Sequence, residues 1–430
     1  MRVLIVGGGG REHTLTWKLA QSPLLEKLYS APGNPGIAKV AECVDIAADD
    51  IENLKKWALE EKIDLTVVGP EAPLVLGLAD SFRVAGLKVF GPGKEGARLE
   101  GSKVWTKRKM KEWGIPSAGF AVFDDFDDAR SHLARFYGGA VVIKAEGLAA
   151  GKGVTVASGP AEAEQALYDI MIERKFGEAG NRVVIEQCLS GEEVSVLAIT
   201  DGKSLVFLPS SQDHKAIYEG DRGPNTGGMG AYSPAPVYTE KLARRTEEQV
   251  FWPLLKGFNN LGVDFRGVIY AGLMVSGDDL NVLEYNVRFG DPEAQALIPR
   301  MKSDLLPLLD AAAGGDLKGL DAEWRGDPAV CVVMASGGYP GSYEKGFPIE
   351  GIDELEHESD GRVAVFHAGT AIKDGRLVTN GGRVLGVTAW DIDLSKALDR
   401  VYSACDRIKF EGAYFRRDIA HRALKRQERE

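Results

Sequence analysis

The chain reads LEYNVRFGDPE from Leu283 to Glu293. Side chains two residues apart share one face of a β-strand. The spacing therefore predicts a strand with one apolar face, to which Leu283 belongs, and one polar face carrying Glu284, Asn286 and Arg288. A solvated edge strand is the usual explanation for such alternation. A carboxylate, an amide and a guanidinium that lead into a Gly-Asp-Pro turn indicate something more specific, namely oxygen ligands for Mg²⁺ and a cation for phosphate oxygens.

Length and composition limit the class of protein. A chain of 430 residues is longer than one hydrophobic core serves, so we expect roughly two to four domains. Apolar residues make up 44% and charged residues 27% of the chain, which is typical of a globular protein in water. The net charge of −11 and the lack of a Lys/Arg-rich block argue against nucleic acid as a partner.

Cysteine usage and hydropathy predict the compartment. The four cysteines are far apart in the sequence and form no CxxC pair: Cys43, Cys188, Cys331 and Cys405. This spacing argues against a zinc site or a disulfide framework, fits a reducing compartment, and predicts four buried thiols. The start, MRVLIVGGGG, lacks the features of a signal peptide, and no apolar run approaches the roughly 18 residues of a membrane span. We therefore expect a soluble, cytoplasmic protein.

The first expected domain, residues 1–101, has the pattern of an open α/β sheet. RVLIVGGGG (2–10) indicates a buried strand and a glycine turn that leads into a helix. Three further β-rich runs end in Gly/Pro turns, at 27–33, 64–70 and 87–93. Helical stretches are expected between them, at 51–61 and 74–85.

The remaining chain predicts α+β structure in two more domains. Residues 102–326 open with a basic helix in GSKVWTKRKMKEWGIP (101–116) and end in an antiparallel block, with a smaller lid-like part at about 120–190. Strands are expected near 117–123, 140–147, 153–158 and 182–191. The boundary to the last domain, 327–430, is expected at Asp316–Asp327, and residues 362–390 indicate hairpins joined by Asp-Gly and Gly-Gly turns.

The N-terminal glycines do not predict a dinucleotide site. Gly7 and Gly9 follow the first strand, but Glu12 stands where a GxGxxG motif has its third glycine. A nicotinamide-dependent oxidoreductase is therefore disfavoured. The free N–H groups at a helix start still suit a phosphate or a carboxylate near residues 8–11.

VVIKAEGLAAGKGVTV (141–156) combines a buried lysine with a glycine-rich turn. Lys144 ends an apolar strand, where an ammonium group is unfavourable unless it meets an anion. The glycines that follow leave backbone N–H groups open to a polyphosphate, and Lys152 adds charge. A mobile hairpin loop would explain the glycines alone, but it does not explain Lys144.

VVIEQCLSGEEVS (183–195) is a weaker signal. Glu186 ends another apolar strand, and Glu193 follows a glycine turn. Extended backbone at this place suits the edge of an adenine, and a carboxylate suits ribose hydroxyls. Alone, the segment is better explained by an ordinary strand and turn, and its weight comes from its position between the glycine loop and the strand at 283.

Taken in order, Lys103, Lys144, the 147–153 loop, residues 185–193 and the strand at 284–288 resemble the ATP-grasp ligases, in which ATP lies between two α+β subdomains. Four segments make the resemblance more specific: VGGGGREH (6–13), IKAEGLAAGKGV (143–154), NTGGMGAYSP (225–234) and RFGDPEAQ (288–295). With these segments the chain resembles the phosphoribosylamine–glycine ligase (glycinamide ribonucleotide synthetase) family over essentially its whole length.

The resemblance implies a nucleotide site and a metal site. The residues implied for ATP are Lys103, Lys144, Gly147, Gly151, Lys152, Gly153, Glu186, Cys188, Leu189 and Glu193. Glu284 and Asn286 would ligate Mg²⁺ or Mn²⁺. Many relatives carry a second acidic ligand on the preceding strand, but GVIYAGLMVSG (267–277) has no carboxylate. A second metal would therefore be held mainly by phosphates or be absent.

The resemblance also implies the acceptor site for glycine and 5-phosphoribosylamine. Its residues would be Gly9, Gly10, Arg11, Glu71, Asp291 and Arg383. Glu71 suits ribose hydroxyls and Arg383 suits a 5′-phosphate. In QDHKA (212–216), Asp213 and Lys215 flank His214 near the reacting groups, and NTGGMG would lie near the glycine site. The residues implied in catalysis are Arg288, Lys144, Asp213, Lys215 and Asp291.

The implied reaction is a ligation in de novo purine biosynthesis. The carboxylate of glycine would attack the γ-phosphoryl group of ATP, and the amine would then displace phosphate from glycyl phosphate. One rival is another ATP-grasp enzyme, such as a carboxylase component, and RFGDPE and NTGGMG argue against it. A second is a nucleotide-binding regulator without catalysis, but Lys144, Glu284, Asn286 and Arg288 are all present. We expect a monomer whose partners are these small molecules, without nucleic acid or membrane.

Overall fold

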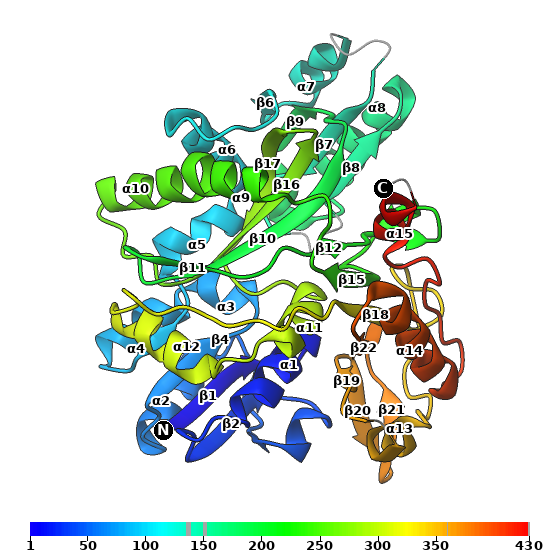
Figure 1. The fold of residues 1–430 in the computed structure, drawn as a ribbon. Coiled ribbons are helices and arrows are strands. Elements are labelled where there is room, and N and C mark those ends of the chain that lie inside the picture. Colours follow the sequence, from blue (N-terminus) through cyan, green and yellow to red (C-terminus); the bar gives the residue numbers. More distant parts are fainter. Residues whose placement is uncertain (135–138, 149–152, 359, 429–430) are drawn as a thin grey trace.

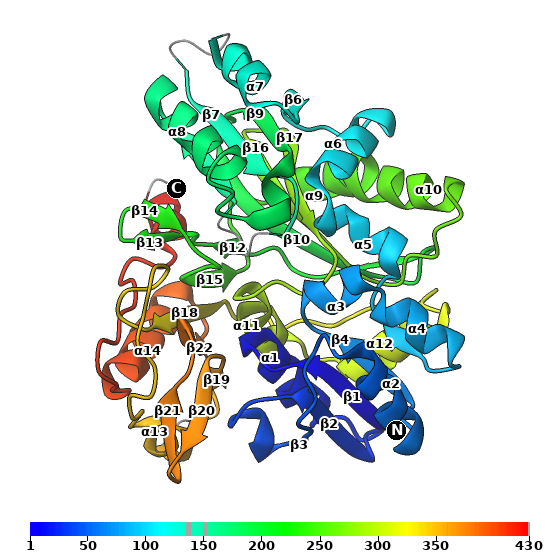
Figure 2. The same ribbon diagram turned by 180° about the vertical axis from the view of Figure 1, so that it is seen from behind.

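The computed structural model describes the chain except for residues 135–138, 149–152, 359 and 429–430 (Figure 1). Among the described residues the strands form two sheets of five strands, two of four and two small hairpins. The N-terminal and C-terminal parts lie side by side in Figures 1 and 2, and the middle of the chain lies above them. The result is the mixed α/β and α+β architecture that the sequence predicts.

The N-terminal sheet is parallel throughout. Its strands are β1 (Arg2–Gly7), β2 (Lys27–Pro32), β3 (Glu42–Cys43), β4 (Leu65–Val68) and β5 (Val89–Phe90), in the order β3-β2-β1-β4-β5. Its helices are α1 (Gly10–Leu19), α2 (Ile51–Glu60), α3 (Glu71–Leu76), α4 (Leu78–Val84) and α5 (Lys94–Gly101), with a 3₁₀ turn at Ile37–Lys39. Leu4 packs with residues of α2 and α4, whereas Ile5 packs with α1, so both faces of the sheet are covered.

The helix expected at 74–85 is divided in two. Gly77 adopts a left-handed φ of 94°, so α3 ends at Leu76 and α4 begins at Leu78. Glycine adopts this conformation without steric strain, which makes it a common helix terminator. The prediction of a single helix was wrong because the apolar pattern continues across the break.

A four-stranded antiparallel sheet occupies the stretch where the lid-like part is expected. Its strands are β6 (Phe120–Phe123), β7 (Val141–Ala145), β8 (Val154–Ala157) and β9 (Val183–Gln187), in the order β6-β9-β7-β8. The accompanying helices are α6 (Lys103–Glu112), α7 (Phe126–Leu133) and α8 (Pro160–Met171), with a 3₁₀ turn at Gly177–Asn181. Ile143, Ile185 and Leu167 belong to the core between this sheet and α8, so the subdomain has a core of its own.

The central sheet is also antiparallel. Its strands are β10 (Glu192–Thr200), β11 (Leu205–Phe207), β16 (Gly267–Ser276) and β17 (Asp279–Asn286), in the order β11-β10-β16-β17. The neighbouring helices are α9 (Glu240–Thr246), a π-helical turn (Glu247–Phe251), α10 (Trp252–Asn260), α11 (Glu293–Leu297), a 3₁₀ turn (Ile298–Arg300) and α12 (Leu305–Gly314). Ile269 packs with residues of α10 on one face, and Val268 packs with residues of α12 on the other. The central sheet is therefore buried on both faces.

The C-terminal sheet takes two strands from the middle of the chain. It consists of β12 (Gln212–Asp213), β15 (Gly230–Ser233), β18 (Ala329–Ala335), β22 (Arg383–Trp390) and β19 (Val363–His367), in that order. The other elements of this part are the hairpin β13 (Ala216–Tyr218)/β14 (Arg222–Asn225), the hairpin β20 (Thr370–Lys373)/β21 (Arg376–Thr379), and the helices α13 (Ile352–Glu358), α14 (Leu394–Arg407) and α15 (His421–Gln427). The sheet thus crosses the boundary expected at 316–327, and it carries the loop 214–229 between β12 and β15.

One of the two predicted C-terminal hairpin turns differs in the structure. β20 and β21 pair across Asp374-Gly375 as predicted, but β22 pairs with β18 and β19 and not with β21. A Cβ on Gly381 would lie 2.8 Å from the Cα atom of Gly369. The Gly-Gly pair at 381–382 therefore permits a close approach of two backbones and does not form a hairpin turn.

The cysteines only partly follow the prediction. Cys331 and Cys405 are buried, Cys188 is half-buried and Cys43 is exposed, and all four thiols are free. Cys43 ends the short edge strand β3, where one side of the backbone has no covering strand. No helix among the described residues is long and apolar enough to cross a membrane.

Strand β17 contains a bulge that the alternating pattern did not predict. Glu284 pairs with Gly272 of β16 while Val282 pairs with Leu273, so Leu283 has no partner. The bulge moves Leu283 out of the core, where Val282 is fully buried instead. The assignment of Leu283 to the apolar face was therefore wrong, because one extra residue shifts the side-chain alternation.

The bulge can be tested by a pair of truncations. We expect Val282→Ala to lower the free energy of unfolding by about 2 kcal/mol, because it leaves a cavity in the core, and Leu283→Ala to lower it by about 1 kcal/mol or less. Thermal unfolding of the two variants and the wild-type protein checks this order. A larger loss for Leu283→Ala would show that the alternation is unbroken.

Candidate active site

Two of three neighbouring lysines contact one buried carboxylate. Lys103 and Lys107 are four residues apart on α6 and so project from the same face, and Lys144 lies near the end of β7. The ammonium groups of Lys107 and Lys144 lie 2.9 and 3.1 Å from the carboxylate of Glu186, whose side chain is 2% exposed. Burial lowers the pKa of Lys103 and lowers that of Lys107 to about 8. Two cations share one anion, which favours binding of a further anion such as phosphate.

Lys144 was predicted to need an anion, and Glu186 is the anion that it contacts. Lys144 pairs with Val184 across β7 and β9, two residues from Glu186, so the two charged side chains share a face of the sheet. Lys144 also donates to the backbone carbonyl of Leu283 at the bulge, over 3.1 Å. Lys107 was missed. Its spacing from Lys103 was an available signal, but a basic helix face is more often solvated.

The start of the glycine loop is attached to α6. The ammonium group of Lys103 donates to the carbonyl of Gly147 over 2.8 Å, and the hydroxyl of Ser102 donates to Glu146. Gly153, at the far end of the loop, accepts a hydrogen bond from the amide of Ala145 (2.8 Å). Two of the residues implied for ATP, Gly151 and Lys152, lie outside the described residues.

The segment implied for adenine lies next to the lysines. Cys188 and Leu189 follow β9 directly, two and three residues after Glu186. Their position next to the lysines is compatible with a nucleotide site. Glu193, implied for ribose, has a side-chain partner of its own, Lys215.

A second charged group joins the central sheet to the segment after β12. The ammonium group of Lys215 lies 2.7 Å from Glu193 and 3.4 Å from Glu284. Lys215, together with Lys144 and Lys103, lowers the pKa of Glu284 to about 2. Burial raises the pKa of Asp213 to about 7. Glu284 is therefore ionised over the whole physiological range, as a metal ligand has to be.

The surroundings of Glu284 fit a hard cation. The residue opposite on β16 is Gly272, and a Cβ there would lie 3.3 Å from the Cγ atom of Glu284. The neighbouring strand thus adds no side chain beside the carboxylate. Asn286 offers its amide oxygen, which accepts one hydrogen bond from Arg288 (3.0 Å) and keeps a second lone pair. These oxygen donors suit Mg²⁺, which fills its remaining positions with water and phosphate.

Arg288 connects the end of β17 to the N-terminal part. Its guanidinium lies 3.3 Å from Glu71 at the start of α3 and 2.9 Å from Glu100 on α5. Burial opposes the charge of Arg288, but Glu100 and Glu71 outweigh it and raise its pKa. The predicted roles of Arg288 at phosphate and of Glu71 at ribose remain predictions, since the two groups bind each other here. Glu100 was missed because no motif marks it.

Asp291 and Arg383, both predicted for the acceptor site, lie next to each other. The guanidinium of Arg383 donates to the backbone carbonyls of Gly227 (2.6 Å) and Asp291 (2.7 Å), and it lies 3.4 Å from the Asp291 carboxylate. Burial would raise the pKa of Asp291, but Arg383 and Arg11 hold it below its ordinary value. Gln295 donates to the same carboxylate over 2.8 Å. The loop NTGGMG, the RFGDPE segment and the C-terminal sheet therefore converge at one place.

The N-terminal glycines border a cavity of about 410 Å³. It is lined by residues of the N-terminal and C-terminal parts: Gly7, Gly8, Gly9, Glu12, Pro32, Gly33, Asn34, Ala47, Ala48, Pro70, Ala368, Gly369, Thr370 and Asn380. Glu12, the residue that breaks the GxGxxG pattern, accepts from the amide of Gly9 and from the side chain of Arg11, each over 2.6 Å. Arg11 also donates to the carbonyl of Phe289 (3.1 Å), so it links α1 to the strand end. A Cβ on Gly10 would lie 2.6 Å from the Gln295 amide nitrogen.

A buried acid was also missed by the sequence analysis. Glu293 on α11 is 3% exposed and accepts a hydrogen bond from the hydroxyl of Tyr270 over 2.6 Å. Tyr270 lies opposite Asn286 in the sheet register and is 2.8 Å from the hydroxyl of Ser195. These groups attach α11 to the central sheet beside the predicted metal ligands.

Lys215 and His214 face in different directions. The Lys215 side chain lies at Glu193 and Glu284, whereas the His214 ring is fully buried against the C-terminal segment, where it accepts from the amide of Ala420 (3.0 Å). The expectation that His214 lies near the reacting groups was therefore wrong for its side chain. Successive side chains of an extended segment point to opposite sides, which separates the histidine from its neighbours.

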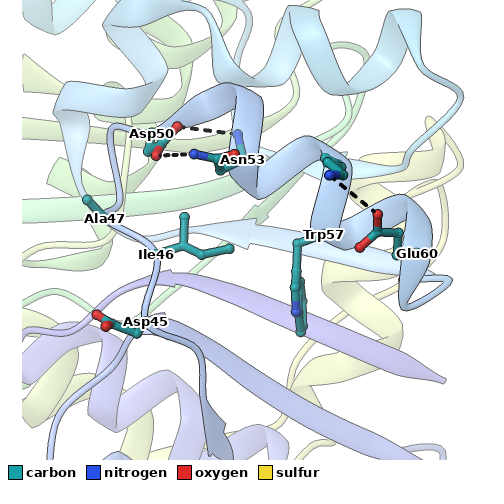
Figure 3. A pocket seen from close by; sticks show the side chains of 8 residues that line it. Asp45, Ile46, Ala47, Asp50, Asn53, Trp57 and Glu60 are labelled. Carbon is teal, nitrogen blue, oxygen red and sulfur yellow. Dashed lines mark hydrogen bonds and ion pairs between the residues drawn. The ribbon is translucent and has the colours of Figure 1, made fainter.

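A hollow of about 390 Å³ on the surface at α2 lacks the features of a site (Figure 3). Asp50 accepts from the backbone and side-chain nitrogens of Asn53, over 3.3 and 2.7 Å, and Lys56 lies 4.0 Å from Glu60. Four polar side chains of this hollow therefore pair with one another, and none of the predicted site residues lines it.

Two antiparallel sheets, with buried lysines on β7 and α6 and an ionised carboxylate on β17, define the class as an ATP-grasp fold. The biotin carboxylase domain of the Hydrogenobacter thermophilus 2-oxoglutarate carboxylase shares this fold, with a TM-score of 0.72 at 15% identity over 96% of this chain and 91% of that one. The chain belongs to the phosphoribosylglycinamide synthetase family. The family's N domain matches residues 1–100, its ATP-grasp domain 101–294 and its C domain 329–422. The family resemblance seen in the sequence is thereby confirmed.

Relatives resemble the chain over its full length. The phosphoribosylamine–glycine ligase of Agrobacterium fabrum is 50% identical over 427 residues, which cover 99% of this chain and 100% of the relative. That of Salmonella typhimurium is 48% identical over 432 residues and covers all of both chains. The crystal structure of the Thermotoga maritima phosphoribosylamine–glycine ligase has a TM-score of 0.85 at 34% identity, over 98% of this chain and 100% of that one.

The role of Lys107 can be tested through pH. Burial lowers its pKa to about 8, so the free protein loses this positive charge as the pH rises through 8. We expect kcat/KM for ATP to fall over that range and Lys107→Met to reduce kcat/KM about 10-fold at pH 7 and to weaken the pH dependence. Steady-state kinetics from pH 6.5 to about 9.5 measures both.

Lys111→Met is the matched control, because Lys111 lies on the same helix α6, four residues beyond Lys107, and is exposed. It is expected to behave as the wild-type protein. An unchanged pH profile in Lys107→Met would remove Lys107 from the nucleotide site.

Proposed function

We propose that this protein is an ATP-dependent carboxylate–amine ligase that joins glycine to 5-phosphoribosylamine and yields glycinamide ribonucleotide, ADP and phosphate, a reaction of de novo purine biosynthesis. One observation carries the proposal. The stretch from Glu284 to Asp291 starts beside Lys144 and Lys215 and ends at Arg383, near the glycine-lined cavity. A single segment thus connects a site suited to a nucleotide with a site suited to an acceptor.

The nucleotide would lie between the four-stranded lid sheet and the central sheet. Lys103 and Lys144 would bind its phosphates, with Lys107 as an additional cation beside Glu186. The backbone at 186–189 would hold adenine. Glu193 would accept hydrogen bonds from the ribose hydroxyls in place of its ion pair with Lys215. Buried lysines bind phosphate strongly because little water competes with them.

Glu284 and Asn286 would hold a divalent cation. Mg²⁺ and Mn²⁺ both accept carboxylate and amide oxygens, and Mg²⁺ fits the small number of protein ligands best. When bound, the cation supplies positive charge at the β- and γ-phosphate oxygens. Lys215 is then free to leave Glu284 and to remain with Glu193 or to contact a phosphate.

Glycine and the phosphorylated amine would bind on the far side of Arg288. Asp291 would hold the amino group of an acceptor, because its carboxylate is kept ionised by Arg383 and Arg11. The glycine-lined cavity would take the phosphoribosyl group, with Gly9, Gly10 and the N-terminus of α1 toward the phosphate. Glu71 and Arg383 remain our candidates for the ribose hydroxyls and the 5′-phosphate.

The chemistry needs activation of a carboxylate. A carboxylate oxygen of glycine attacks the γ-phosphorus of ATP, the bond to the bridging oxygen of ADP breaks, and glycyl phosphate forms. The amine nitrogen then attacks the carbonyl carbon, phosphate departs, and the nitrogen loses a proton. Lys144, Lys215 and Arg288 neutralise charge and align the groups, which is the main requirement of phosphoryl transfer. No side chain acts as a nucleophile in this scheme.

We further propose a cytoplasmic monomer that acts on small molecules, without nucleic acid. The negative net charge of −11 supports the last point. The proposed division is an N-terminal domain at 1–101, an ATP-grasp domain at 102–326 and a C-terminal domain at 327–430. The strands β12 and β15 belong to the sheet of the last domain, although they lie in the second by sequence.

The proposal is tested by ADP release from Mg·ATP. The purified protein is assayed with glycine or phosphoribosylamine omitted in turn, and the unstable amine is generated in place from ribose 5-phosphate and ammonia. We expect sustained release that needs both substrates, with one ribonucleotide amide formed per ADP. The proposed acceptors would be rejected if ADP were released without formation of the amide. They would also be rejected if the protein preferred another amino acid to glycine.

The metal assignment has its own test. We expect Glu284→Gln to lower kcat for ADP release about 100-fold or more, because the amide removes the anionic ligand, while the thermal midpoint stays within a few degrees of the wild type. Asp279→Asn, on an exposed side chain of the same strand β17, is the matched control and should leave turnover unchanged. Near-normal turnover in Glu284→Gln would reject Glu284 as a metal ligand.

A further inference from the structure

The last described residues cross back onto the segment that carries Lys215. Residues 414–426, which we name the C-terminal strap, include most of α15 and lie beside β13 and β14 (Figure 2). Arg416 is fully buried and donates to the carbonyl of Ala216 over 3.0 Å. Its guanidinium also lies 3.0 Å from Asp221 in the turn of the hairpin. An arginine without exposed surface, bonded to backbone and carboxylate together, fixes the hairpin to the strap.

Further contacts repeat this connection along the strap. Asp418 accepts from the amide of Gly220 over 2.8 Å, and Arg422 lies 2.7 Å from Asp221. Tyr414 donates to the carbonyl of Ile217 over 3.0 Å. The strap therefore holds the first strand, β13, and the turn of the hairpin that begins directly after Lys215.

His214 connects the strap to the candidate site. Its Nε2 atom accepts a hydrogen bond from the amide of Ala420 over 3.0 Å, so this nitrogen carries no proton and the proton of the neutral ring lies on Nδ1. Nδ1 faces Asp221 at 3.5 Å. Ala420 has a left-handed φ of 64°, an uncommon conformation for alanine, which indicates that the surrounding contacts determine its amide direction.

The group of His214, Asp221 and His421 does not fit a metal ion, although their ligand atoms lie within 4.8 Å of one another. Each oxygen of Asp221 is already bound by an arginine, Arg416 at 3.0 Å and Arg422 at 2.7 Å. The protonated Nδ1 of His214 has no lone pair to offer. Two adjacent arginines also make the site unfavourable for a cation.

We infer that His214 is a positioning residue for Lys215, and that the C-terminal strap acts through it. The side chains of residues 213 and 215 share the side opposite to His214. The carbonyl of Lys215 is held as well, by the amide and the hydroxyl of Thr226, each over 2.8 Å. With the backbone fixed on both sides, the ammonium group of Lys215 is placed between Glu193 and Glu284. The strap, which is more than 190 residues away along the chain, thereby sets a charge beside the proposed metal ligand.

This inference rests on the proposed function, because its kinetic readout is ADP release. We expect His214→Leu, which removes the acceptor for the Ala420 amide, to lower kcat about 10-fold or more while KM for ATP changes less than about threefold. His214→Gln places an amide oxygen near the former Nε2 position and is expected to recover kcat to within about threefold of the wild type. Arg417→Ala is the matched control, since the Arg417 side chain pairs with Asp406 and does not contact residues 213–222.

Amide hydrogen exchange of residues 213–229 gives a readout that does not depend on activity. Exchange should be faster in His214→Leu than in the wild type and near wild-type in His214→Gln. Should His214→Leu fail to fold, Arg422→Met weakens the same connection at a partly exposed position, and we expect it to lower kcat about threefold or more.

The outcomes separate the two proposals. A wild-type protein that releases no ADP rejects the proposed function, and the exchange data then decide the positioning role alone. The inference would be overturned if His214→Leu kept the kcat and the amide exchange of the wild type. It would also be overturned if the leucine and glutamine variants lost kcat equally. Where Arg422→Met is tested in place of His214→Leu, an unchanged kcat would overturn it.

Discussion

A buried ionised side chain needs an opposite charge close to it, because the protein interior solvates ions poorly. The candidate site depends on this constraint. Glu186 lies between Lys107 and Lys144, and Arg288 lies between Glu71 and Glu100. Removing the shared member, Glu186 or Arg288, would leave its partners charged and buried, which is typically destabilising by about 3–5 kcal/mol. The same charged pairs that suit the site to binding an anion therefore also hold the site together.

These pairs connect parts of the chain that lie far apart in the sequence. Arg288 joins the central sheet to two N-terminal helices, and Arg383 joins the C-terminal sheet to the residues after β17. The strands β12 and β15, which come from the middle of the chain, extend the C-terminal sheet and so connect these two parts as well. The site consequently forms only when all parts have folded and met. In the proposed reaction, which would pass through an unstable acyl phosphate, this arrangement would keep both steps within one network of charges.

Sequence reasoning worked where the physical cause is local. The N-terminal strands end in glycine turns, and Lys144 ends an apolar strand that forced the prediction of an anion partner. It failed where a distant contact decided the outcome. At the bulge, the backbone carbonyl of Leu283 accepts a hydrogen bond from Lys144, which lies 139 positions away in the sequence. His214 turns toward Ala420, 206 positions away, and Lys107 becomes part of the site through Glu186. No short-range pattern distinguishes Lys107 from a solvated lysine on a basic helix.

The sequence by itself determined the open α/β sheet at the N-terminus, the antiparallel block in the middle of the chain, and the residue types available to the site, because periodicity and turn residues act over a few positions. Only the tertiary structure decided which carboxylate meets which cation. Arg288 finds Glu71 across 217 positions, and Arg383 finds Asp291 across 92. Such pairing follows from how sheets and helices pack, and charges of either sign are frequent enough in the chain that spacing alone does not select the partners.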